Sequence, residues 1–130
     1  MRKGRKIRVV VVDESEEALK GIRSFLEGHR EIEVVGEFRD GYDLVDKAKE
    51  LGPDLIITNI HAPRMSGIEY TLALRETMPN TRFIVFTDLA GSAALKKASE
   101  DALVCVDQSQ LAERLDREIR RLFPGSGDTD

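Results

Sequence analysis

The sequence predicts an α/β domain built on a parallel sheet, and two observations support this prediction. Short apolar segments rich in β-branched residues recur along the chain, at residues 7–12, 32–35, 55–57, 83–86 and 103–106. Between these candidate strands lie segments in which apolar residues recur every three or four positions, which is the period of an amphipathic helix. Alternation of strands with helices favours a parallel sheet that helices cover on both faces.

Length and composition fit one such domain. The chain has 130 residues, of which 41% are hydrophobic and 34% are charged, as in a single folded domain. We expect residues 7–123 to form the domain, residues 1–6 to be a flexible basic N-terminus, and residues 124–130 to be a flexible tail or the start of a linker. The formal net charge of −4 argues against a nucleic-acid binder that depends on attraction to phosphates.

Cysteine and histidine content excludes two further classes of site. Cys105 is the single cysteine, so an internal disulfide is excluded, and with His29 and His61 it gives no zinc-type ligand spacing. This content favours the reducing cytoplasm. No apolar run approaches the roughly 20 residues that cross a bilayer, so we expect no membrane span.

The first two helices have well-marked ends. The first is expected to begin after Ser15 as its N-cap and to end near Gly28. The second is expected over residues 40–51, and it stops at Gly52-Pro53 because proline cannot continue a helix. The residues predicted to be buried are Leu19, Ile22, Phe25 and Leu26 in the first helix and Leu44, Val45, Ala48 and Leu51 in the second.

Three more helices follow. Ser66 and Glu69 have the spacing of a capping box, and the helix that they start closes before Pro79. A short alanine-rich helix is expected within residues 92–99, and the last helix ends at Phe123-Pro124. The residues predicted to line the core are Ile68, Leu72, Leu74 and Met78 in the third helix and Leu111, Leu115, Ile119 and Leu122 in the last.

The topology predicts where a site belongs. With right-handed crossovers, five strand–helix units most simply form the flavodoxin-like strand order 2-1-3-4-5. Ligands bind such sheets at the carboxyl ends of the strands, in the crevice between the first and third strands. The residues at the strand ends are Asp13, Glu14, Asn59, Thr87, Asp88, Val106 and Asp107.

Three sequence stretches carry a resemblance to a known family. They are VVVVDES, PDLIITNIHAPRMSGIE and FIVFTD, and together they resemble the receiver domain of two-component response regulators over nearly the whole chain. The resemblance implies metal-binding positions at Asp13 and Glu14, a phosphoacceptor position at 59, a switch position at Thr87 and a lysine position at 106. The stretch IEVVGEFRDG further resembles receivers that precede a DNA-binding helix-turn-helix domain.

The departures from this family pattern point to a degenerate receiver. Asn59 stands where the family has its phosphoacceptor Asp, Val106 where it has a Lys, and Leu103 where it commonly has a switch aromatic. A carboxamide oxygen is a poor nucleophile because the nitrogen lone pair is delocalised, so Asn59 cannot form an acyl phosphate by the usual route. We therefore expect no phosphorylation by a histidine kinase.

A remnant acidic pocket is expected at Asp13, Glu14 and Asp88. With the neutral oxygen of Asn59, Asp13 and Glu14 offer the hard ligands that Mg²⁺ prefers, and we expect weak binding if any. Simpler interpretations stay open: Asp13 and Glu14 as acids that cap the first helix, Asp88 as a surface turn, and Thr87 as an ordinary strand-end residue.

These inferences predict a regulatory module that binds protein partners and is not an enzyme. The resemblance implies contacts, including homodimer formation, on the face made by the fourth helix, fifth strand and fifth helix. The candidate residues are Arg114, Arg117, Arg120 and Arg121, which a solvated helix face explains equally well.

Two alternatives remain. The first is the N-terminal receiver of a helix-turn-helix regulator, in which nucleic acid is bound only by a domain outside this sequence. The second is a phosphohydrolase like the haloacid dehalogenases with Asp13 as nucleophile. That family requires a second Asp two residues later, where this chain has Ser15.

Overall fold

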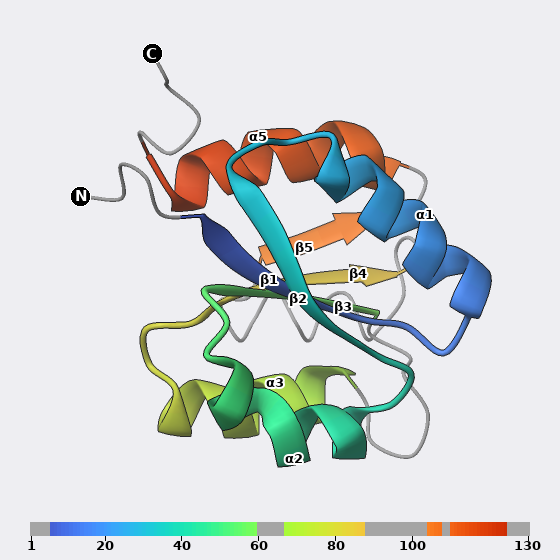
Figure 1. The fold of residues 1–130 in the computed structure, drawn as a ribbon. Coiled ribbons are helices and arrows are strands. Elements are labelled where there is room, and N and C mark those ends of the chain that lie inside the picture. Colours follow the sequence, from blue (N-terminus) through green and yellow to red (C-terminus); the bar gives the residue numbers. More distant parts are fainter. Residues whose placement is uncertain (1–5, 60–66, 88–103, 108–109, 125–130) are drawn as a thin grey trace.

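The computed structural model describes residues 6–59, 67–87, 104–107 and 110–124 (Figure 1). Five parallel strands form one sheet in the order β2-β1-β3-β4-β5, which confirms the predicted order. The strands are β1 (Ile7–Val12), β2 (Ile32–Phe38), β3 (Leu55–Asn59), β4 (Arg82–Thr87) and β5 (Val104–Asp107).

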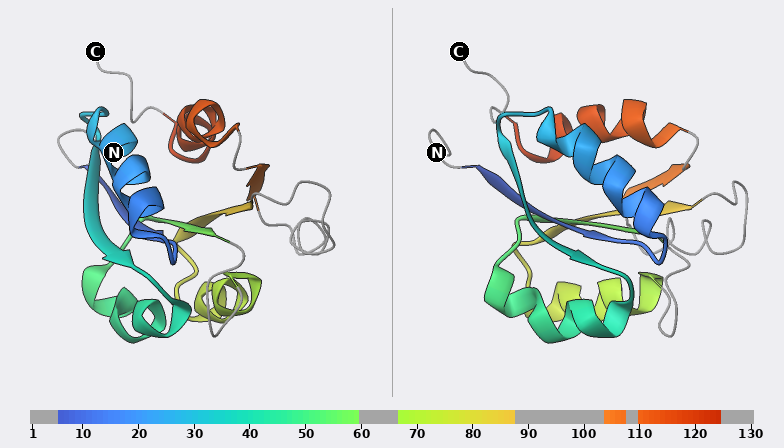
Figure 2. Two further views of the ribbon diagram at one scale, coloured as in Figure 1. Left: turned by 90° about the vertical axis from the view of Figure 1, so that its right-hand side faces the viewer. Right: turned by 45° about the vertical axis from the view of Figure 1, so that its right-hand side comes forward.

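Helices cover both faces of this sheet. Figure 1 shows α1 (Glu16–Glu27) and α5 (Leu111–Leu122) on one face and α2 (Gly41–Leu51) and α3 (Gly67–Thr77) on the other. The two further views in Figure 2 show the twisted sheet lying between these two helix layers. The helix expected within residues 92–99 lies outside the described residues.

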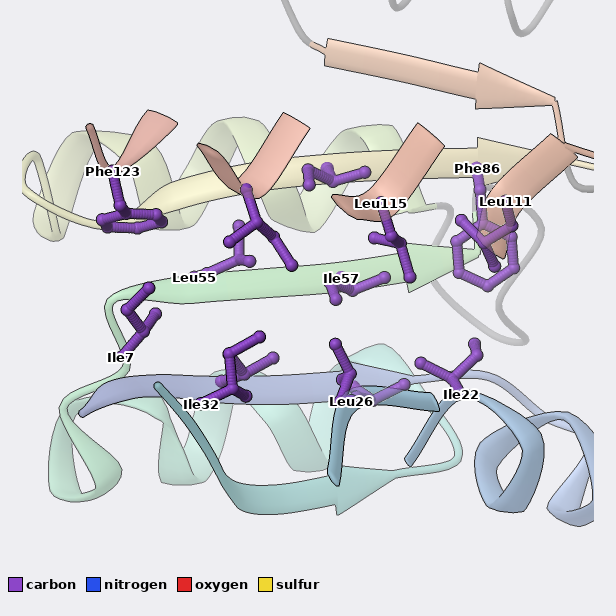
Figure 3. Close-up of a cluster of buried hydrophobic side chains, with 14 of the residues drawn as sticks. Ile7, Ile22, Leu26, Ile32, Leu55, Ile57, Phe86, Leu111, Leu115 and Phe123 are labelled. Atoms are coloured by element: carbon purple, nitrogen blue, oxygen red, sulfur yellow. The ribbon is translucent and has the colours of Figure 1, made fainter. Parts of the chain in front are cut away.

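The strands divide their side chains between two cores because successive residues of a strand point to opposite faces. In β1, Ile7 belongs to the core under α1 and α5 that Figure 3 shows, and Val9 and Val11 belong to the same core. Val10 and Val12 belong to the core over α2 and α3. Burial on both faces explains why β1 is an almost uninterrupted apolar run.

The helix ends match the sequence signals. The Ser15 hydroxyl accepts a hydrogen bond from the Ala18 backbone N–H at 3.1 Å, and α1 ends at Gly28. The Asp40 carboxylate accepts from the Asp43 N–H at 3.0 Å at the start of α2. Gly52 ends α2 with a φ of 55°, a left-handed conformation that glycine adopts without steric cost.

One predicted core position was wrong. Val45 is 41% exposed, because α2 buries Gly41, Leu44 and Ala48 and Val45 lies one helical step away from that stripe. Phe25, Leu51 and Met78 are only partly buried and pack against the edges of the two cores.

The inner side of α3 also differs from its predicted stripe. Tyr70 and Thr71 are fully buried together with Leu74, whereas Leu72 is half-buried. The side chain of Ile68 and the cap Ser66 lie outside the described part of the chain. Among the described residues, no helix is long and apolar enough to cross a bilayer.

Candidate functional site

The site predicted at the carboxyl ends of the strands is centred on Asp13 and Asn59. Val12 pairs with Thr58 in the sheet, so Asp13 follows β1 directly beside Asn59, the last residue of β3. The Asp13 side chain is buried, with 3% of the residue exposed. Residues 9, 11 and 13 share one face of β1, and residues 55, 57 and 59 share the same face of β3, so both polar side chains point to one side of the sheet.

Both oxygens of the Asp13 carboxylate accept hydrogen bonds. Oδ2 accepts from the Asn59 side-chain amide at 3.2 Å, and Oδ1 accepts from the Ser15 backbone N–H at 2.9 Å. The second bond ties Asp13 to the start of α1, where the helix dipole favours negative charge. The Asn59 amide thus donates to Asp13 from the position where the resemblance puts a second carboxylate.

Glu14 does not share this buried position. It is exposed, and its backbone oxygen accepts from Arg39 Nε at 2.9 Å and Nη2 at 2.7 Å. A shallow pocket next to this contact is lined by Glu14, Ser15, Arg39 and Asp40. The expected acidic pair therefore consists of the buried Asp13 and the exposed Glu14, which lines the shallow pocket.

A buried tyrosine of α3, Tyr70, contacts β3 next to Asn59. The Tyr70 hydroxyl is hydrogen-bonded to the Thr58 hydroxyl, and its ring packs on Gly41, where an added Cβ would lie 2.3 Å from Tyr70 Cδ2. Burial raises the pKa of Tyr70, and the negative charges of Asp13 and Asp40 raise it further, so the phenol stays protonated. Thr58 contacts α3 through this bond, on the face of the sheet opposite to that of its neighbour Asn59.

Sequence reasoning missed Tyr70. The signal available was Gly41 directly after the N-cap Asp40, because a glycine inside the first turn of a helix suggests that another group approaches closely. Which group approaches could not be read from spacing alone.

The residues present fit a divalent cation poorly. Asp13 accepts two protein hydrogen bonds, Asn59 turns its nitrogen toward that carboxylate, and Glu14 is exposed. Within the described residues no group of three His, Cys, Asp or Glu side chains is arranged to hold a metal ion. We derive no chemical step through a metal at this site.

The remaining strand-end positions are placed by the backbone. Asn59, Phe86 and Val106 occupy one row across β3, β4 and β5, and Thr87 pairs with Asp107 in the next row. The positions that the resemblance identifies as acceptor and lysine are therefore two strands apart in the same row. Asp88, Leu103 and His61 lie outside the described residues, as does the side chain of Cys105.

The arginines predicted for contacts are mostly paired within α5. Arg114 Nη2 and Arg121 Nε donate to Glu118 at 3.2 Å and 2.8 Å, and Arg120 pairs with Asp116 at 3.3 Å. Arg117 is exposed. These ion pairs make part of the arginine-rich face a structural network of the helix.

The sequence of this chain was compared with family models and with curated proteins. The family model described as response regulator receiver domain matches residues 9–116. The response regulator protein VraR of Staphylococcus saprophyticus is 38% identical over 81 residues, which are 62% of this chain and 39% of that protein. A protein-glutamate methylesterase/protein-glutamine glutaminase of Geobacter sulfurreducens is 45% identical over 101 residues, which are 76% of this chain and 26% of that protein.

Several solved structures are similar to this chain in fold. The isolated REC domain of RcsB from Salmonella enterica serovar Typhimurium has a TM-score of 0.85 and 25% identity, with 97% of this chain and 94% of that chain covered. The response regulator domain of Thermotoga maritima CheB has a TM-score of 0.78 and 31% identity, with 91% of this chain and 96% of that chain covered. The chain spans less than half the length of the curated relatives named above.

Proposed function

We propose that this chain, which belongs to the response regulator receiver family, accepts no phosphoryl group in the usual way and signals through protein contacts. The observation that carries the proposal is the hydrogen bond from the Asn59 amide to the buried Asp13 carboxylate. Position 59 follows the apolar run of β3, where the resemblance puts the phosphoacceptor. The side chain there is a donor to the acidic pocket and has no nucleophilic oxygen.

Electrostatics supports the same proposal. Two unit charges 4 Å apart interact by about 4 kcal/mol at an effective dielectric near 20, so a second carboxylate beside Asp13 would need a cation to balance it. Asn59 removes one negative charge and Val106 removes one positive charge relative to the family pattern. On this proposal, the hydrogen bonds from the Asn59 amide and the Ser15 backbone N–H stabilise the buried Asp13 carboxylate in place of a metal or a phosphoryl group.

The partners are proposed from the relatives. Several are response regulators or transcriptional regulatory proteins, such as VraR and LnrK, and RcsB has been solved in complex with DNA. We propose that this receiver controls such an output through contacts, in the cytoplasm, and that any nucleic acid is bound by a domain outside this sequence. Self-association through α5 and the neighbouring elements is part of the proposal, and sedimentation of the purified chain tests it.

The phosphohydrolase alternative has less support. Both oxygens of Asp13 are held by Ser15 and Asn59, whereas a nucleophilic carboxylate needs an oxygen directed at the substrate. Hydrolysis of a generic phosphate ester that the Asp13→Ala variant loses would favour the enzyme.

Treatment with acetyl phosphate and Mg²⁺, followed by intact-mass measurement, tests the main proposal. We expect an unchanged mass, with a receiver that carries the acceptor Asp labelled in parallel as the positive control. A stable phosphoryl adduct in this pocket of the unaltered protein would overturn the proposal.

A further inference from the structure

We propose that the exposed side of α2 is a contact surface for a second copy of this chain. In the described part of the chain two large apolar side chains are exposed, Tyr42 at 49% and Val45 at 41%, and both belong to α2. Asp46 and Lys49 are exposed on the same helix. The four residues are spaced at i, i+3, i+4 and i+7, so they share one side of the helix. We call them the α2 patch.

The α2 patch is accessible from outside the molecule. The residues that α2 buries are Gly41, Leu44 and Ala48. Val45 lies at the border of this buried side, and the other members of the patch lie further round the helix. Figure 2 shows α2 in an outer layer, with the sheet on one side of it and no described element on the other. The patch can therefore be covered by another molecule without any change in the fold.

The order of charges along α2 selects the partner. Asp43 lies in the first turn and Lys49 in the last turn, with Asp46 between them, so acidic residues precede the basic one. Lys47 and Glu50, which depart from this order, pair with each other at 3.8 Å. A helix with its charges separated in this way is complementary to a second copy of itself that runs in the opposite direction.

Antiparallel packing about a two-fold axis near Val45 gives every member of the patch a neighbour. A two-fold contact forms each pair twice, so Tyr42 lies opposite the partner's Lys49 at both ends, as in a cation–π contact. Val45 of each copy lies near the axis, where apolar surface leaves water. Asp46 lies one turn from the partner's Lys49, within reach of a lysine side chain across helices about 8–10 Å apart.

This contact is separate from the self-association proposed for α5. The two helices cover opposite faces of the sheet (Figure 1), and the α2 patch contains neither Asp13 nor Asn59. The inference therefore goes beyond the proposed function and does not depend on the state of the pocket. A contact made by one helix from each copy is small, and small contacts form and break readily, which suits a module that signals through protein contacts.

Sedimentation equilibrium of the full chain at concentrations up to about 1 mM tests the contact. We expect a reversible monomer–dimer equilibrium. Asp46→Lys and Lys49→Asp should each raise the dissociation constant by about tenfold, because each change occurs twice in a symmetric dimer and replaces attraction by repulsion. The double variant, Asp46→Lys with Lys49→Asp, exchanges the two charges and should bring the dissociation constant back toward that of the unaltered chain.

Lys47→Asp is the matched control. It makes the same change of charge as Lys49→Asp in the same helix but outside the patch, so it should leave the dissociation constant unchanged. Circular dichroism checks that each variant is folded. A chain that stays monomeric up to about 1 mM, or a double variant that associates no better than the single variants, would overturn the inference. Loss of association in Arg117→Asp but not in the α2 variants would assign the contact to α5 instead.

Discussion

The hydrogen bond between Asn59 and Asp13 is the residue-scale feature on which the proposed function depends. Replacing Asn59 by Asp removes the donor and places a second carboxylate next to a buried one. We expect Asn59→Asp to lower the free energy of unfolding at pH 7 by about 1–3 kcal/mol. Mg²⁺ should restore part of the loss, because a cation can then balance two carboxylates. Chemical denaturation with and without Mg²⁺ measures both effects.

Asn59→Ala separates the lost bond from the added charge. It removes the donor but adds no carboxylate, so its destabilisation should not respond to Mg²⁺. The cost of Asn59→Asp should also shrink below about pH 4, where carboxyl groups take up protons. An Asp variant as stable as the unaltered chain at pH 7 without Mg²⁺ would show that the pocket tolerates a second charge unaided.

Gly41 and Tyr70 form the second contact that matters at this scale. A Cβ on Gly41 would lie 2.3 Å from Tyr70 Cδ2, and Tyr70 is fully buried, so neither group can move away freely. We expect Gly41→Ala to destabilise the protein by about 1–3 kcal/mol, as overpacking does. The midpoint of thermal or urea unfolding measures this cost.

Gly21→Ala is the matched control, because that glycine is exposed in α1 and an added Cβ would have open space around it. Alanine favours the helix over glycine by about 0.5–1 kcal/mol, so this variant should be more stable than the unaltered chain. If Gly41→Ala is as stable as the unaltered chain or more stable, the contact between Gly41 and Tyr70 is not a close one.

At the scale of elements, the buried carboxylate of Glu118 links two arginines of α5. Glu118 is 6% exposed and accepts hydrogen bonds from Arg121 and Arg114. Burial of the Glu118 carboxyl acts to raise its pKa, but the hydrogen bonds and positive charges of the two arginines outweigh burial and hold the pKa below its usual range. A lowered pKa means that folding favours the ionised form.

The stability that Glu118 contributes should therefore depend on pH. It is present above the unfolded value of about 4.3 and is lost as the pH falls through the lower folded value. We expect Glu118→Gln to cost about 1 kcal/mol at pH 7 and progressively less as the solution becomes acidic. Glu113→Gln, at an exposed position of the same helix, should cost less at pH 7. Equal costs for both variants would mean that the arginine pairs add nothing.

The elements that were predicted well are those with a local signal. Ser15, Asp40 and Gly52 mark helix ends through hydrogen bonds and backbone angles that form within a few residues, so the sequence alone locates them. Val45 and Tyr70 were misjudged for the opposite reason. Which side of a helix is buried depends on the sheet and helices around it. Periodicity alone allows Val45 to belong to the apolar side of α2, but the neighbouring elements cover a narrower part of the helix and leave Val45 exposed.

For the whole molecule, alternation of strands and helices together with crossover handedness was enough to predict the strand order and the edge that carries the site. The hydrogen bonds at that edge could not be predicted. Asp13 and Asn59 are 46 residues apart in the chain, and only the sheet register brings the amide against the carboxylate. Glu14 shows the same limit of prediction from sequence. It is adjacent to Asp13 in the chain, but its side chain is exposed whereas that of Asp13 is buried.

We expect the sheet register to determine which substitutions would make the receiver accept a phosphoryl group. Asn59 and Val106 lie in one row, with Phe86 between them, so both departures from the family pattern affect the same edge. We expect Asn59→Asp alone to gain no phosphoryl label from acetyl phosphate and Mg²⁺, because it restores a nucleophile without the nearby positive charge that would balance it. Asn59→Asp combined with Val106→Lys should be labelled, whereas Val106→Lys alone should not. Intact-mass measurement of all three variants distinguishes these outcomes, and labelling of the single Asp variant as strong as that of the double variant would show that the lysine position is dispensable.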